Sequence, residues 1–363
     1  MKGSKANGSR WIKTAAFAAL SLFSTGSWAG LYNDGKVFLT GGVFTVDGAG
    51  GGGAVPWATI TGYESRDGIN GGVGFTYVRL PNYDINWIGG SIGFFDRFEL
   101  SYVNTKLTTD LSNVNTVALV VDALELAGTP LVGDLGLSSN GSKLHMDTYG
   151  AKLRLFGDAV YTSDSFIPQT AIGFLYKKNT TPEFVRTLNA DKAKDWEAYL
   201  AFTKVFFRYS TLVNVTVRYT AANQIGLTGF GGCDLGHNNC NSDKEFRGEV
   251  SIAHLLQKNF AIGGEYQQHG NKQKGKTVDT GGLLATDPDG NLVSDLVSNL
   301  IGGVSGLTGL NNALAQNESD WYDFFFAYAP SKNYSITMAY LFLGDVAVAS
   351  QQNGLYLSLH ATF

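Results

Sequence analysis

The chain has 363 residues, a formal net charge of −4 and only 16% charged residues, while 13% are aromatic. This charge balance excludes a nucleic-acid-binding protein, which needs a basic patch. The chain also has fewer charged residues than a typical soluble domain, in which about 25% of residues are charged. A mean hydropathy of −0.03 excludes a bundle of membrane helices, each of which needs about 20 consecutive apolar residues, but it suits strands that are half apolar and half polar.

Residues 1–29 predict a secretory signal peptide. A basic start that ends at Lys13 precedes an apolar run over residues 14–23, and Ser27 and Ala29 stand where small residues precede a cleavage site. An N-terminal anchor helix is the alternative, but the apolar run is too short to span a bilayer. Residues 30–363 are therefore the expected mature, exported protein.

From residue 37 onward, segments of about ten residues alternate between apolar and polar side chains, the pattern of membrane-spanning strands. We expect strands at 37–46, 57–64, 69–79, 83–95, 98–107, 144–156, 166–176, 196–207, 212–222, 246–256, 260–269, 321–329, 334–343 and 355–363. These make about 14 strands, an even number, as a single-chain bacterial barrel requires. Twelve is the alternative count, which applies if residues 37–46 form an internal plug and another segment is reassigned.

The last predicted strand, residues 355–363, indicates that the sheet is closed. Its apolar face, which begins at Leu355, alternates with polar residues up to the final position, Phe363. A chain end normally frays unless it is held, so we expect this strand to be paired on both edges, as in a closed barrel. We expect the barrel assembly machinery to recognise the terminal aromatic, Phe363, and outer-membrane lipid to surround the barrel.

The joints between the predicted strands alternate in length. Short joints lie at 65–68, 96–97, 157–165, 208–210, 257–259 and 330–333, and long ones lie at 108–142, 177–194, 223–243, 270–317 and 344–353. Short periplasmic turns on one rim and long extracellular loops on the other are typical of outer-membrane barrels, and only the short joint at 80–82 departs from this rule. The sequence thus predicts an all-β, transmembrane antiparallel β-barrel in the outer membrane of a Gram-negative bacterium. A soluble sandwich or propeller is the alternative that alternation alone permits.

Two blocks of sequence resemble a known family. The first contains Leu-Thr-Gly-Gly-Val-Phe at 39–44, four glycines at 50–53, Pro-Trp-Ala at 56–58 and Tyr-Val-Arg at 77–79, and the second is Phe-Asp-Arg-Phe-Glu-Leu-Ser-Tyr at 95–102. Both are similar to a family of Gram-negative outer-membrane proteins, domain of unknown function 3034. The resemblance implies the compartment and the barrel fold, and it implies no activity. More distantly, the architecture is similar to channels for hydrophobic compounds, such as the long-chain fatty acid channel family.

If the apolar faces meet lipid, the polar faces line a lumen, because a charge in the lipid band is costly. The candidate lumen-lining residues are Glu99, Lys152, Arg154, Glu197, Arg218, Arg247, Glu249, Glu265, Asp323 and His360. Their mixed signs argue against a pore of strong anion or cation selectivity, which uses rings of one sign. They could line a permeation path or neutralise one another in a packed interior, and the sequence leaves both possibilities open.

Two short motifs have residues that could hold a cofactor or a metal. Residues 48–53 match G-x-G-x-x-G, but no helix follows them, so a dinucleotide site is not predicted. Cys233 and Cys240 are expected to form a local disulfide in an oxidising compartment. His237 lies between them, but two thiols and one imidazole fall short of the usual four zinc ligands. The sequence therefore predicts no cofactor and no metal.

The expected function is an outer-membrane channel for passive or facilitated diffusion of small, partly apolar solutes. The insertions at 108–142 and 270–317 carry apolar segments that could constrict the barrel mouth or form an extracellular cap. A non-conducting surface or scaffold barrel whose long loops bind a partner is the alternative. A membrane-embedded hydrolase ranks third, because His145, His254 and His360 occur without a nucleophile elbow, and the protein is not expected to be an enzyme.

Overall fold

The structure is a computed structural model that describes residues 45–62, 68–111, 115, 118, 138, 141–160, 165–234, 236–278 and 314–363. The predicted signal peptide and most of both insertions lie outside the described residues. No helix among the described residues is long and apolar enough to span a bilayer.

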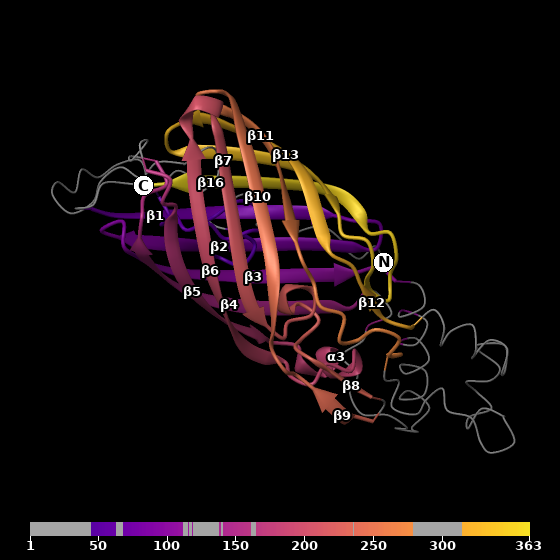
Figure 1. Ribbon diagram of the computed structural model, residues 1–363. Helices are drawn as coiled ribbons and strands as arrows, with labels where there is room; N and C mark the ends of the chain where they lie inside the picture. Colours follow the sequence, from indigo (N-terminus) through magenta and orange to yellow (C-terminus); the bar gives the residue numbers. More distant parts are fainter. Residues whose placement is uncertain are drawn as a thin grey trace, which may run out of the picture.

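Twelve antiparallel strands form a closed barrel (Figure 1). They are β1 (Ile69–Arg79), β2 (Tyr83–Phe94), β3 (Phe98–Thr109), β4 (Lys143–Phe156), β5 (Gln169–Asn179), β6 (Lys194–Phe206), β7 (Thr211–Thr220), β10 (Glu245–Gln257), β11 (Phe260–Gln267), β13 (Trp321–Ser331), β14 (Tyr334–Phe342) and β16 (Asn353–Thr362). Each strand pairs with the barrel strands next to it in sequence, and β1 pairs with β16 to close the ring. The predicted fold class is therefore confirmed.

Alternation along each strand separates the two faces of the barrel wall. In β13, the side chains of Phe324 and Phe326 are exposed on the outside, whereas Asp323 and Ala327 are buried on the inside. The other strands repeat this pattern, so large apolar and aromatic side chains cover the outer face. An apolar outer face with a polar interior is the arrangement of a transmembrane barrel, in which lipid covers the outer face.

The C-terminal residues are hydrogen-bonded into the sheet, as their alternation of apolar and polar side chains predicts. The register of β16 against β1 runs from Arg79 opposite Leu355 to Gly72 opposite Thr362. Beyond that pair, Gly71 and Phe363 exchange two backbone hydrogen bonds, each 3.0 Å long. The final residue is therefore held by the same ladder that closes the barrel.

The count of about fourteen strands is wrong, and the alternative count of twelve is confirmed. Residues 57–62 form no strand, and residues 45–62 form a coil inside the barrel, in which Trp57 and Ala58 are almost completely buried. We call residues 45–62 the plug. Its glycines and Pro56 disfavour a regular strand, and side chains of the barrel wall satisfy its backbone instead, as when Thr203 accepts a 2.7 Å hydrogen bond from the Ala58 amide.

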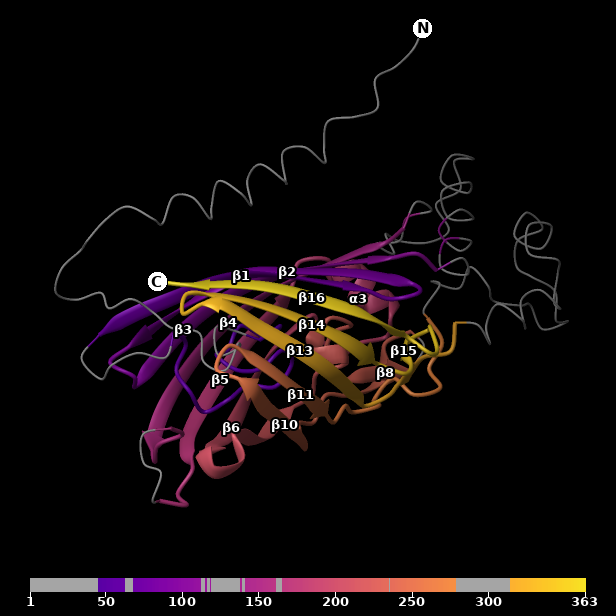
Figure 2. The same cartoon turned by 90° about the horizontal axis from the view of Figure 1, so that it is seen from above.

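The two rims of the barrel differ in structure (Figures 1 and 2). Near the C-terminus, the joints are short, and one contains the 3-10 helix η1 (Phe207–Tyr209). The opposite rim carries the remaining small elements, which are α3 (Pro182–Thr187), η2 (Gln224–Gly226), β8 (Gly232–Asp234), β9 (Asn238–Asn241), β12 (Asn317–Glu318) and β15 (Val346–Ala347). In a barrel of twelve strands, the joint at 80–82 lies on this second rim. It is therefore a short loop on the rim that carries the long loops. We call this side the outer rim.

Candidate functional site

The ten residues predicted to face the lumen all lie on the inner side of the barrel wall. None of these residues is more than 8% exposed, and they are Glu99, Lys152, Arg154, Glu197, Arg218, Arg247, Glu249, Glu265, Asp323 and His360. The structure brings them into four groups, of which two hold the plug, one holds loops at the rims and one lies beside open space.

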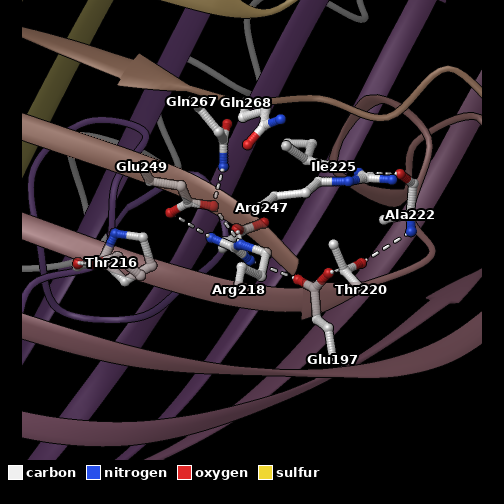
Figure 3. A network of polar contacts seen from close by, with 12 residues as sticks. Glu197, Thr216, Arg218, Thr220, Ala222, Ile225, Arg247, Glu249, Gln267 and Gln268 are labelled. Atoms are coloured by element: carbon white, nitrogen blue, oxygen red, sulfur yellow. Dashed lines mark hydrogen bonds and ion pairs between the residues drawn. The ribbon is translucent and has the colours of Figure 1, made fainter. Parts of the chain in front are cut away.

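One group is a buried ion-pair network around Asp47 of the plug. Lys177 contacts Asp47 at 2.6 Å and Glu197 at 2.6 Å. Arg218 contacts Asp47 at 2.8 Å, Glu197 at 2.7 Å and Glu249 at 2.5 Å. In Figure 3, the guanidinium of Arg218 lies between the carboxylates of Glu197 and Glu249. Two cations thus hold three carboxylates, one of which belongs to the plug.

Neutral groups complete this network. Thr220 donates a 2.7 Å hydrogen bond to Glu197, and Gln267 donates a 3.0 Å hydrogen bond to Glu249. A buried ion pair repays its desolvation only when the remaining polar atoms are also satisfied. The network therefore fixes one end of the plug to β5, β6, β7 and β10.

A second buried pair, Glu99 with Lys152, holds the middle of the plug through its backbone. The Lys152 ammonium donates to the carbonyl oxygens of Gly50 at 2.8 Å and Thr59 at 2.7 Å, and it lies 3.1 Å from Glu99. Glu99 accepts hydrogen bonds from the amides of Gly50 at 2.8 Å and Thr61 at 2.7 Å. The sequence left open whether such charges line a permeation path or neutralise one another. Glu99 and Lys152 neutralise one another and bind the plug.

Uncharged side chains of the same wall bind the plug as well. The carbonyl oxygen of Pro56 accepts hydrogen bonds from Thr216 at 2.7 Å and Asn214 at 3.2 Å. The indole of Trp57 donates to Ser251 at 3.2 Å. Together with the two ion-pair groups, these contacts attach the plug to β3, β4, β5, β6, β7 and β10, which we call the clamped wall.

The rest of the barrel wall, which we call the open wall, leaves space beside the plug. It consists of β11, β13, β14, β16, β1 and β2, and three hollows lie along it, of which the outermost also borders β3 and β4. The lower hollow is lined by Gly52, Gly53, Trp57, Glu265, Asp323, Phe325, Ala327, Thr337, Ala339, Tyr356 and His360. The middle hollow is lined by Val46, Ala54, Val78, Ile85, Trp87, Glu265, Gln267, Trp321, Tyr322, Asp323, Leu341, Leu343 and Tyr356.

The outer hollow lies under the loops of the outer rim. It is lined by Leu80, Tyr83, Ile85, Leu107, Thr109, Leu111, Leu144, Phe184, Leu188, Gln224, Leu227, Thr228, Val278, Trp321, Leu343, Val346, Ala347 and Val348. Most of these side chains are apolar, so the hollow offers a water-poor surface.

The three hollows share walls. The lower and middle hollows have Glu265, Asp323 and Tyr356 in common, and the middle and outer hollows share Trp321 and Leu343, among others. They therefore form one series along the open wall, which we call the passage. It runs from an apolar entrance at the outer rim, past the plug, to the half of the barrel that holds the C-terminus.

Two ionisable groups at the outer rim are perturbed by burial. Burial raises the pKa of Glu318 to about 8, although the nearby charge of Arg247 acts in the opposite direction. The His269 ring stacks on Trp321 with 4.4 Å between ring centroids. Burial, together with the charge of Arg247, lowers the pKa of His269 well below its usual value. In both cases burial favours the neutral form of the side chain.

The remaining candidates serve the rims. Arg247 donates hydrogen bonds to the Ala222 carbonyl at 2.6 Å and to Glu245 at 2.8 Å, which anchors the loop after β7 (Figure 3). Arg154 forms ion pairs with Asp96 and Asp158 near the short-turn rim. These two arginines hold loops and do not touch the passage.

Sequence reasoning missed two members of the ion-pair network. Lys177 was assigned to a loop, but β5 extends to Asn179, and Leu175, Lys177 and Asn179 all face inward. Continuing the period of two beyond residue 176 would have found it. Asp47 carries no such signal, because its partners come from strands more than a hundred residues away in sequence.

The cysteine motif forms the predicted disulfide, between Cys233 and Cys240. His237 lies 3.2 Å from the sulfur of Cys233 and 4.0 Å from that of Cys240. Both sulfurs are used by the disulfide, so neither is the thiolate that a metal requires. The motif pins β8 to β9 on the outer rim.

The three histidines considered for hydrolysis are separated by the barrel wall. His145 and His254 alternate with the inward-facing residues of β4 and β10, so both are on the outward side of their strands. His360 faces inward, and its ring lies 2.9 Å from the hydroxyl of Ser358. That hydroxyl also lies 2.8 Å from Thr76. This serine–histidine pair faces the lumen, where membrane lipid has no direct access.

Comparison with known proteins identifies a family. The family model described as "Protein of unknown function (DUF3034)" matches residues 40–360. No curated protein matches the chain. Among solved structures, the chain is similar to the KdgM porin (9% identity, 80% of this chain and 99% of that chain covered, TM-score 0.39) and the NanC porin (8%, 81% and 98%, 0.42). It is also similar to outer membrane phospholipase A from Escherichia coli (8%, 81% and 91%, 0.33). At these identities and scores, the likeness carries no functional argument.

Proposed function

The chain belongs to the DUF3034 family of proteins of unknown function, and we propose from the geometry of its lumen that it is an outer-membrane channel for small, partly apolar solutes. Solutes enter at the outer hollow and move along the open wall. The plug stays attached to the clamped wall and sets the width of the passage. The proposal includes location in the outer membrane of a Gram-negative bacterium, with outer-membrane lipid around the barrel.

The observation that carries this proposal is the uneven attachment of the plug, whose ion pairs among the described residues all lie on the clamped wall. Ion pairs and hydrogen bonds fill the space between the plug and the clamped wall, so no solute passes there. Along the open wall, the same plug is bordered by three hollows that share residues with one another. On the open wall, Glu265 accepts hydrogen bonds from the amides of Gly53 and Ala54, and the hydroxyl of Ser91 lies 2.6 Å from that of Thr61. The hollows lie beside these contacts, so the plug narrows the lumen without filling it.

The chemistry of the entrance favours partly apolar solutes. Side chains such as Leu107, Leu144 and Phe184 surround the outer hollow, and burying apolar solute surface there is worth about 25 cal/mol per Å². Deeper in the passage, Glu265 and Asp323 line both the lower and the middle hollow. An apolar capture site followed by a polar interior suits solutes with one apolar and one polar end.

The non-conducting scaffold and the hydrolase are less well supported by the same geometry. A scaffold needs no hollows inside its barrel, whereas three hollows that share lining residues lie beside the plug. A lipid hydrolase needs its nucleophile on the lipid side, whereas Ser358 and His360 face inward and are at most 8% exposed. We therefore propose a transport role without catalysis.

Planar-bilayer conductance and liposome swelling with the refolded full-length chain test the proposal. Leucine and asparagine are matched swelling solutes, because they are zwitterions of similar size that differ in side-chain polarity. We expect measurable conductance and faster swelling with leucine. Absence of both signals, also after deletion of residues 270–317 and after release of the plug by Arg218→Met, would refute the channel and favour the scaffold.

A further inference from the structure

Two acidic side chains face each other in the passage. Glu265 on β11 and Asp323 on β13 are direct partners in the strand register. Both are more than nine-tenths buried, and both line the lower and the middle hollow. They therefore stand at the point where these two hollows meet.

Each carboxylate presents an oxygen without a partner. The amides of Gly53 and Ala54 donate hydrogen bonds of 2.9 Å and 2.6 Å to one oxygen of Glu265. The other oxygen of Glu265 and one oxygen of Asp323 are buried and have no hydrogen-bond partner among the described residues. No lysine or arginine in the described part of the chain forms an ion pair with either side chain. A buried carboxylate without a cation is costly, so this pair is suited to receive a positive group.

The plug keeps the free oxygen of Glu265 within reach. A Cβ atom at Gly52 would lie 1.9 Å from that oxygen, so only glycine permits this close approach. Around the two acids, the lower hollow is bordered by the rings of Trp57, Phe325 and Tyr356. Aromatic faces attract cations that have shed part of their water. Acidic oxygens beside aromatic rings are the combination that binds an organic ammonium group.

We propose that Glu265 and Asp323 form a binding site for the ammonium group of a small organic amine in the passage. This inference rests on the proposed channel function and names its favoured solute class. The ammonium donates hydrogen bonds to the free oxygens of the two acids, while its apolar part lies against the aromatic rings. An organic anion of equal size meets repulsion at the same place.

Calorimetric titration of the detergent-solubilised full-length chain tests the site without requiring conduction. The probes are n-butylammonium chloride and sodium butyrate, which share an apolar tail and differ in the sign of the head group. We expect the wild type to bind butylammonium and to give no heat with butyrate. In the Glu265→Gln/Asp323→Asn double variant, the dissociation constant for butylammonium should rise at least about tenfold, because a charge-assisted hydrogen bond is worth roughly 1.5–3 kcal/mol.

A matched control removes one negative charge elsewhere. Asp195 pairs with Lys244 at the outer end of β6, so Asp195→Asn should leave the affinity for butylammonium within about twofold. Equal binding of butylammonium to the wild type and the double variant, or binding of butyrate as strong as that of butylammonium, would overturn the site. If the double variant does not fold, as judged by heat-modifiable gel migration, Asp323→Asn alone decides, because it leaves both hydrogen bonds between Glu265 and the plug in place.

The reversal potential across a gradient of butylammonium chloride separates the site from the channel. A preference for cations in the wild type that is lost in the double variant supports both the ammonium site and the channel. Conductance with equal reversal potentials in the two proteins overturns the site while the channel stands. Binding that depends on the two acids, without conductance or swelling, overturns the channel while the site stands.

Discussion

The clamped wall and the open wall surround the same plug, but their carboxylates differ in whether a cation neutralises them. On the clamped wall, Lys152, Lys177 and Arg218 lie within about 3 Å of the carboxylates that they neutralise. On the open wall, Glu265 and Asp323 have no such cation among the described residues. Small side chains such as those of Ala327 and Ala339 leave space there instead.

Under the proposed channel function, this difference explains how a barrel can be both stable and permeable. Charges that are paired with one another on the clamped wall fix the plug to that half of the interior. Charges that are left unpaired in the other half remain available to a passing solute. Each variant below tests one side of this division, beginning with the largest expected effect.

Removing the central cation of the clamped wall should release the plug. In Arg218→Met, the buried carboxylates of Asp47, Glu197 and Glu249 lose their shared partner. Loss of one member of a buried ion-pair network costs about 3–5 kcal/mol, so the urea midpoint should fall and single-channel conductance should rise. Arg218→Lys, which keeps the charge, is the control and should lose less stability. Unchanged stability and conductance in Arg218→Met would show that the network does not hold the plug.

The outer rim should become less stable as the pH rises. The pKa of Glu318 is raised from 4.5 to about 8 by burial, so the folded protein binds more protons than the unfolded chain between these values. The free energy of unfolding should therefore fall over this range by up to roughly 4 kcal/mol.

Comparison of the wild type with Glu318→Gln isolates this dependence. His269 has a lowered pKa and acts in the opposite direction below about pH 6.5, but it is present in both proteins. We expect the difference in urea midpoint between the two proteins to grow from pH 5 to pH 8 in favour of Glu318→Gln. A difference that does not vary with pH would contradict the buried state of Glu318.

A methyl group between the plug and the open wall should disturb the passage. In Gly52→Ala, the added Cβ would lie 1.9 Å from Glu265, and overpacking of this kind costs about 1–3 kcal/mol. Gly248→Ala is a matched control, because its Cβ would meet nothing closer than 3.9 Å. Lower stability and altered conductance should appear in the first variant alone. Equal behaviour of the two variants would mean that the plug does not approach Glu265 closely.

The smallest effect is expected at the disulfide. Reduction of Cys233–Cys240 should leave the barrel folded and conducting, because β8 and β9 form a separate two-stranded sheet outside the barrel ring. Mass spectrometry should detect alkylation of both cysteines only after a reductant is added. Loss of conductance on reduction would show that this loop takes part in the passage.

The sequence predicts the wall of this barrel far better than its contents. Alternation is local, so the inward positions of Glu99, Arg218 and Asp323 follow from a period of two. Residues 57–64 alternate in the same way, but 57–62 form no strand, because Thr203 and Asn214 satisfy the plug from distant strands. The passage depends on how all twelve strands pack around the plug, and no local pattern encodes that arrangement.

Blocking the open wall tests the central claim most directly. Ala339 faces inward and lines the lower hollow, so Ala339→Trp should fill the passage without touching the clamped wall. Ala151 alternates with the inward-facing residues of β4, so Ala151→Trp places the same side chain in lipid. Single-channel recordings should show that conductance is lost in Ala339→Trp and kept in Ala151→Trp. Wild-type conductance in a folded Ala339→Trp variant would contradict a path along the open wall.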